Sequence, residues 1–171
     1  GIETRFITPS MTDAQIESRI DENTRLLYGE TLANPSLRVL DISRFAALAH
    51  RAGLPLFVDN TFPTPILCRP FQFGADVVIH SATKYMDGHA VVLAGAIVDG
   101  GSFDWAADGR YPELTTPDPS YHGVCYTERF GREAFIRKAR VQLLRDLGCT
   151  LSPLSAFLLD LGLTTLQLRM E

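Results

Sequence analysis

Short apolar runs recur along the first hundred residues, and turn-forming residues such as Gly, Pro, Asn and Asp separate them. Apolar runs of about four to eight residues with such boundaries are typical of buried strands. They predict strands over residues 2–7, 25–31, 54–59, 76–80 and 93–98. Apolar strands separated by helices are typical of a parallel sheet covered on both faces. The pattern therefore predicts an α/β fold, with a mostly parallel sheet flanked by helices.

Apolar residues at three- and four-residue spacing predict helices between and after these strands. The predicted helices cover residues 13–20, 42–52, 133–147 and 153–161. Thr12 or Asp13 can cap the first helix, and Asp41 can cap the second, because short oxygen-bearing side chains accept from the free N–H groups of a first turn. Gly53 is expected to end the second helix. Pro153 suits the first turn of the last helix.

Residues 99–130 interrupt the regular pattern. The segment is rich in Gly, Pro, Asp, Tyr and Trp and has little periodicity. A structureless segment of this length usually has a function beyond connecting two elements. We expect it to be a functional or subunit-contact insert, and the alternative is a surface loop packed by its own aromatic side chains.

Composition excludes several classes of protein. Hydrophobic residues make up 46% of the chain and charged residues 21%, which is typical of a folded domain. The net charge of −4 argues against a nucleic-acid partner, and no apolar run approaches the length of a membrane span. Cys68, Cys125 and Cys149 form no CxxC pair, which argues for a reduced compartment and against a zinc site. We therefore expect a cytoplasmic protein that contacts neither nucleic acid nor membrane.

The ends of two predicted strands carry candidate chemistry. Asp59 ends one strand, and Ser81, Thr83 and Lys84 follow the next. The carboxyl ends of neighbouring parallel strands meet at one edge of a sheet, where ligands bind. A lysine amine, a carboxylate and short hydroxyl donors together suit pyridoxal phosphate, whose aldehyde, ring nitrogen and phosphate need these three kinds of group. Lys84 would bind the aldehyde, Asp59 would face the ring nitrogen, and Ser81 and Thr83 would contact the phosphate.

Each of these residues also has an ordinary structural interpretation. A lysine after a strand is commonly a solvated surface residue, and an aspartate at a strand end is commonly a turn or helix cap. The apolar run Val77–Ile79 leads directly toward Lys84, and this favours a chemical role because burying a free ammonium is costly. On the residues alone, both interpretations stay open.

Residues 58–101 resemble the Cys/Met-metabolism family of pyridoxal-phosphate enzymes, which includes cystathionine synthases and lyases, methionine γ-lyase and O-acetylhomoserine sulfhydrylases. The motifs that carry the resemblance are D-N-T at residues 59–61, H-S-x-T-K at 80–84 and the following G-H at 88–89. The likeness extends over nearly the whole chain. It implies the central part of the large domain of a fold-type I pyridoxal-phosphate-dependent transferase.

The resemblance also implies roles for individual residues. It makes Lys84 the covalent anchor of the cofactor, Asp59 the partner of the ring nitrogen, and Ser81 and Thr83 the phosphate ligands. The E-T-x-x-N-P motif at residues 30–35 places Asn34 beside the phenolic oxygen of the cofactor ring. Asp87 departs from the family pattern, which usually has Gly there.

The insert points to one branch of the family. Residues 103–123 and 140–148 resemble O-acetylhomoserine sulfhydrylases, whereas cystathionine synthases and lyases are shorter at the insert. This implies γ-replacement on O-acetylhomoserine, an amino-acid substrate whose acetate is replaced by sulfide or a thiol to give homocysteine or methionine. Lys84 would act as the general base at Cα. Methionine γ-lyase or cystathionine γ-synthase chemistry is the alternative on the same scaffold.

The chain lacks several parts of such an enzyme. The family's ring-stacking aromatic residue and its carboxylate-binding arginine match nothing between Gly1 and Glu171. We therefore expect residues 1–171 to be a partial pyridoxal-phosphate-binding catalytic domain with both flanks missing, and residues 148–171 to begin the link to a C-terminal domain. The family implies a homotetramer for the whole protein. A catalytically inactive fragment or a structural scaffold is the alternative from another class.

Overall fold

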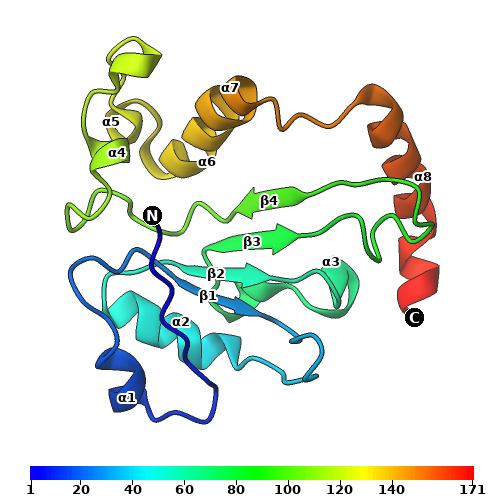
Figure 1. Ribbon diagram of the computed structural model, residues 1–171, viewed down its shortest axis with the longest axis horizontal. Coiled ribbons are helices and arrows are strands. Elements are labelled where there is room, and N and C mark those ends of the chain that lie inside the picture. Colours follow the sequence, from blue (N-terminus) through cyan, green and yellow to red (C-terminus); the bar gives the residue numbers. More distant parts are fainter.

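A four-stranded sheet forms the centre of the computed structural model, which describes residues 1–171 (Figure 1). The strands are β1 (Leu27–Glu30), β2 (Leu56–Asp59), β3 (Val77–His80) and β4 (Ala96–Asp99), in that order across the sheet. β1, β2 and β3 are parallel, and β4 is antiparallel to β3. The predicted mostly parallel sheet is confirmed.

The predicted strand over residues 2–7 is wrong. The segment has no strand partner, and Ile2 and Phe6 are exposed. Arg5 instead pairs with Asp21 at 2.7 Å and donates to the carbonyl of Arg19 at 2.9 Å. Alternation of apolar and polar residues makes a strand only where a sheet edge is available to accept its backbone hydrogen bonds.

Helices α1 (Asp13–Glu17) and α2 (Ile42–Arg51) contribute to the core on one face of the sheet. Thr12 caps α1 and Asp41 caps α2, as predicted, and the backbone of Gly53 beyond α2 has a φ of +68°. α1 ends three residues earlier than predicted. The apolar side of these helices and one face of the sheet share a core that includes Ile16, Leu48 and Val58.

The opposite face carries a second core, built largely by the insert and the helices after it. The helices of this region are α4 (Pro112–Thr115), α5 (Tyr126–Phe130) and α6 (Ala134–Lys138), and a π-helical segment Ala139–Leu144 connects α6 to α7 (Arg145–Leu147), which buries no residue. Trp105 and Tyr126 of the insert are buried here against Phe57 and Val77 of the sheet. The insert is therefore folded into short helical turns, and its aromatic side chains contact one another and the sheet.

Two further helices lie beyond the carboxyl ends of β1–β3 (Figure 1). They are α3 (Thr64–Leu67), after β2, and α8 (Pro153–Met170), which extends nine residues past its predicted end. The short 3-10 segments Pro70–Phe73, Pro119–Tyr121 and Gly131–Glu133 complete the helical turns. No helix is both long and apolar enough to cross a membrane.

Candidate active site at the carboxyl edge of the sheet

The end of β2 is organised around Asp59 and Asn60. The Asp59 carboxylate accepts from the backbone N–H of Thr61 at 2.9 Å and from the Tyr28 hydroxyl at 3.3 Å. Asn60 is fully buried, and its amide nitrogen donates to the carbonyls of Thr64 at 3.1 Å and Cys68 at 2.9 Å. This network fixes the backbone on which Asp59 is presented.

A hydrogen bond joins the end of β2 to the end of β3. The backbone N–H of Ser81 donates to the Thr61 hydroxyl at 2.8 Å. The structure thus brings the D-N-T and S-x-T-K motifs together, as predicted from the meeting of parallel strand ends. The Ser81 hydroxyl has no hydrogen-bond partner and is free to donate.

Thr83 differs from Ser81 in this respect. Its hydroxyl donates to the carbonyl of Ala94 at 3.2 Å and accepts from the Ala94 N–H at 2.9 Å. A hydroxyl has one proton, so Thr83 would have to release Ala94 before it could donate to a phosphate. The role of Thr83 as a phosphate ligand stays a prediction, and its observed contact holds the segment before β4 against the Lys84 turn.

Lys84 is exposed, and its amine makes no hydrogen bond or ion pair. Its backbone is ordered by a turn in which its N–H donates to Ser81 at 3.1 Å and its carbonyl accepts from Gly88 at 2.8 Å. The buried run of β3 stops at His80, so the lysine lies outside the apolar environment expected from the sequence. The other lysine of the chain, Lys138, is paired with Asp118 at 2.6 Å.

Asn34 lies on the same edge of the sheet but makes no hydrogen bond to the other candidate residues. It follows β1, whose last residue Glu30 is in register with Asp59. Its backbone N–H donates to the Glu30 carboxylate at 3.1 Å, and its side chain is exposed. Its role beside the cofactor ring therefore stays a prediction.

Sequence reasoning missed Asn60 and Tyr28. Asn60 follows Asp59 in the D-N-T motif. Its position directly after a buried strand was a signal that could have identified it. Tyr28 carries no such signal, because only the β1–β2 pairing brings it near Asp59. Burial, together with the charge of Asp59, raises the pKa of Tyr28 to about 12. Burial also lowers the pKa of His80, whose Nδ1 is buried without a partner.

The donor set fits pyridoxal phosphate. A free amine at Lys84, a carboxylate at Asp59 and a free hydroxyl at Ser81 meet at one edge, and these are the groups that the aldehyde, ring nitrogen and phosphate require. The carboxylate is held by a backbone N–H, so it has lone pairs left for a ring N–H.

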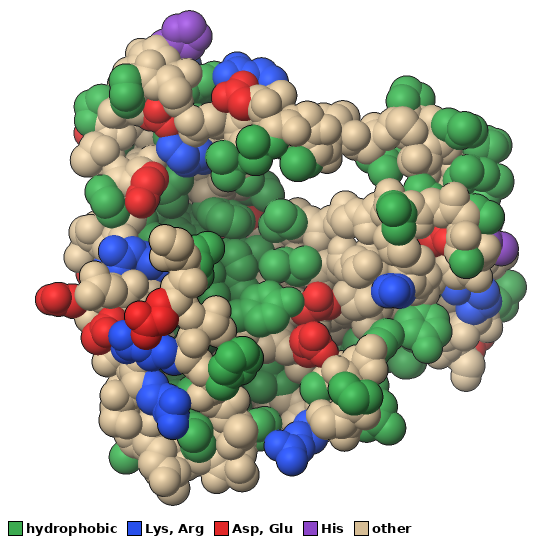
Figure 2. Space-filling view, viewed as in Figure 1, with side chains coloured by type: hydrophobic (Ala, Val, Ile, Leu, Met, Phe, Trp, Pro, Cys, Tyr) green, Lys and Arg blue, Asp and Glu red, His purple; other side chains and the backbone are tan.

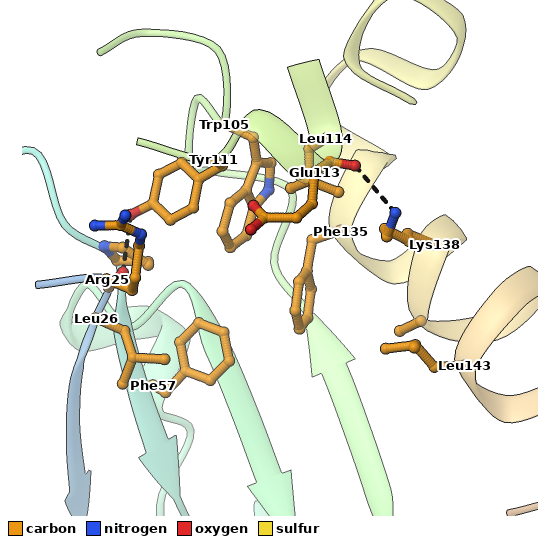
Figure 3. Close-up of a pocket in the computed structure, with 12 residues that line it drawn as sticks. Arg25, Leu26, Phe57, Trp105, Tyr111, Glu113, Leu114, Phe135, Lys138 and Leu143 are labelled. Carbon is orange, nitrogen blue, oxygen red and sulfur yellow. Dashed lines mark hydrogen bonds between the residues drawn. The ribbon is translucent and has the colours of Figure 1, made fainter. Parts of the chain in front are cut away.

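An apolar pocket lies elsewhere in the molecule. It has a volume of about 280 Å³ and opens beside the starts of β1 and β2, where Leu26 and Phe57 line it with Trp105 and Phe135 (Figure 3). Figure 2 shows hydrophobic side chains gathered around a hollow on this face. The start of a parallel strand is the opposite end from Asp59 and Lys84, so this pocket is separate from the candidate site.

Comparison with known proteins decides the family. The family model described as "Cys/Met metabolism PLP-dependent enzyme" matches residues 1–171. The chain belongs to this family. The resemblance predicted from D-N-T and H-S-x-T-K is confirmed, as are pyridoxal phosphate as the family's cofactor and the assignment to a fold-type I large domain.

Individual relatives point to one branch. Homocysteine synthase of Schizosaccharomyces pombe is 47% identical to this chain over 173 residues, and O-acetyl-L-homoserine sulfhydrylase 1 of Thermus thermophilus is 48% identical over 172 residues. Both alignments cover the whole of this chain. They cover 40% of the length of the first relative and 41% of the length of the second. A crystal structure described as an O-acetylhomoserine (thiol)-lyase of Campylobacter jejuni, with N'-pyridoxyl-lysine-5'-monophosphate, superposes with a TM-score of 0.82 at 36% identity, over 91% of this chain and 38% of that one. The chain thus spans about 40% of the length of the curated relatives it matches.

Proposed function

We propose that the whole protein is a pyridoxal-phosphate-dependent transferase that replaces the acetate of O-acetylhomoserine with sulfide or a thiol. The products are homocysteine or methionine, and acetate. One observation carries the proposal in this chain: of its two lysines, Lys84 alone has a free amine, and it lies at the same sheet edge as Asp59. The names of the relatives support the reaction.

The residues of the site then have distinct tasks. Lys84 binds the cofactor aldehyde and moves a proton at Cα of the substrate. Asp59 keeps the ring nitrogen protonated, Ser81 donates to the phosphate, and Asn34 contacts the phenolic oxygen. When bound, pyridoxal phosphate supplies an electron sink for the pair left at Cα. Thr83 holds the segment after the Lys84 turn through Ala94, and reaches the phosphate if that contact opens.

We also propose the setting in which the site works. Residues 1–171 form part of the catalytic domain, and residues 148–171 begin the link to a C-terminal domain. The whole protein is a cytoplasmic homotetramer. The family membership and the fraction of relatives covered support a partial domain.

Borohydride reduction with pyridoxal phosphate, followed by peptide mapping, tests the assignment in the whole protein. We expect a phosphopyridoxyl group on Lys84, none on that peptide in Lys84→Ala, and undiminished labelling of Lys84 in the control Lys138→Met. Full turnover by Lys84→Ala would refute the role of the lysine. Product analysis with and without sulfide then separates replacement from methionine γ-lyase or cystathionine γ-synthase chemistry, and absence of turnover would favour a structural protein.

A further inference from the structure

In the turn that carries Lys84, the carbonyls of Tyr85 and Met86 have no partners inside the turn. Residues 81–88 are joined by bonds from Lys84 to Ser81, from Asp87 to Ala82 and from Gly88 to Lys84. The carbonyls of Tyr85 and Met86 take no part in these bonds. Because the Lys84 amine has no partner of its own, the position of this backbone decides where the amine can reach.

Arg169, near the end of α8, binds both of these carbonyls. Its guanidinium donates to Tyr85 at 2.7 Å and to Met86 at 3.4 Å. The same side chain is held to its own helix by Gly162 at 2.9 Å and by the Thr165 hydroxyl at 3.0 Å. A guanidinium is a planar fork with five donors, so one side chain can bridge two backbones in a fixed geometry.

Two glycines allow this close approach. A Cβ on Gly88 would overlap the Arg169 guanidinium, and a Cβ on Gly162 would overlap the backbone of Asp87. Arg169 lies at the surface, but Gly162 and Asp87 beneath it are buried. Helix and turn therefore pack backbone against backbone, and Arg169 closes the contact from outside.

We propose that Arg169 is a positioning residue for Lys84, and that Gly162 allows α8 to approach the Lys84 turn closely enough for Arg169 to bind it. By fixing the turn through Tyr85 and Met86, α8 sets the direction from which the Lys84 amine meets the cofactor and the substrate. This inference rests on the proposed function of Lys84 as the cofactor-binding lysine. It assigns a task in the site to a residue 85 positions away in the sequence.

The test compares Arg169→Met and Arg169→Lys with Arg140→Met in the whole protein. Arg140 is a matched control because it is exposed and makes no side-chain hydrogen bond or ion pair. We expect Arg169→Met to keep binding cofactor but to lower kcat about 10- to 100-fold, the cost of misplacing a reacting group by about 1 Å, with a smaller change in KM. The visible circular dichroism of the bound cofactor should change as well, because it reports orientation. Arg169→Lys should recover part of kcat, and Arg140→Met should match the parent protein.

A second variant covers the case in which Arg169→Met does not fold. Gly162→Ala should lower the thermal unfolding midpoint and alter the same dichroism, although alanine is the better helix former. Unchanged kcat and dichroism in folded Arg169→Met, or in Gly162→Ala, would overturn the positioning role while the label stays on Lys84. Loss of the label from Lys84 in the parent protein would instead refute the proposed function.

Discussion

Replacing Asn60 with Leu keeps the volume of the side chain and removes every hydrogen bond that its amide makes. The Thr31 hydroxyl loses its acceptor at 2.9 Å, and the carbonyls of Thr64 and Cys68 lose a donor. Thr64 keeps a second partner, because its carbonyl also accepts from the Cys68 N–H at 3.2 Å. The Thr31 hydroxyl keeps no hydrogen-bond partner, and Thr31 is only 6% exposed.

The magnitude follows from these partners. A buried donor left unsatisfied costs about 1–3 kcal/mol, and each of the other two bonds contributes about 0.5–1.5 kcal/mol net. Asn60→Leu should therefore lower the free energy of unfolding by about 2–6 kcal/mol, a large part of the roughly 5–15 kcal/mol typical of a domain. Adding Thr31→Val removes the stranded hydroxyl, so the double variant should be more stable than the sum of the two single changes predicts.

Urea unfolding of the chain measures both the loss of unfolding free energy and the departure from additivity in the double variant. Circular dichroism and the fluorescence of the single tryptophan, Trp105, follow the transition. Asn23→Leu is a suitable control, because the Asn23 side chain is exposed and makes no hydrogen bond of its own. A loss below about 0.5 kcal/mol for Asn60→Leu, or strict additivity with Thr31→Val, would refute the reasoning, since surface changes commonly reach that size.

Two pH-dependent contributions follow from the ion and hydrogen-bond pairs. Burial and the neighbouring Asp59 raise the pKa of Tyr28 to about 12. The stability that this phenol contributes is therefore present below pH 10 and is lost as the pH rises toward 12. In the cofactor-free protein, Asp59→Asn should lower this pKa, as measured by a tyrosinate absorbance titration. The hydrogen bond from Lys138 lowers the pKa of Asp118 to about 2. The stability that this pair contributes is therefore present above pH 4 and is lost as the pH falls toward 2. Lys138→Met should raise the pKa of Asp118 measured by NMR titration.

Most of the fold could be predicted from the sequence because its elements are locally encoded. β2 and β3 are apolar runs with clear boundaries, and α2 has both a capping Asp41 and a terminating Gly53. The strand predicted at residues 2–7 fails because strand formation needs a partner edge that no local pattern specifies. The extension of α8 to Met170 was missed because its apolar residues continue past Leu161 without marking a helical face or a stop.

The candidate site divides along the same line. The meeting of the Asp59, Ser81 and Lys84 segments could be predicted because motif residues at the ends of neighbouring parallel strands lie at one edge of the sheet, whereas the roles of these residues stay predictions. The contacts that hold them could not be predicted. Tyr28 reaches Asp59 only through strand pairing, and Thr83 uses its proton on Ala94, a partner that depends on how the chain returns into β4.

The contacts that support the site join residues both near to one another and far apart in the sequence. Asn60 bonds to Thr64 and Cys68, which follow it in the chain, and to Thr31 after β1, and the Thr61–Ser81 bond spans one strand connection. The turn that carries Lys84 is closed from outside by Arg169, at the far end of the chain. The chemical motif and the geometry that makes it usable thus have different origins. The motif consists of a few adjacent residues, whereas the geometry requires α8 to pack against the completed sheet edge.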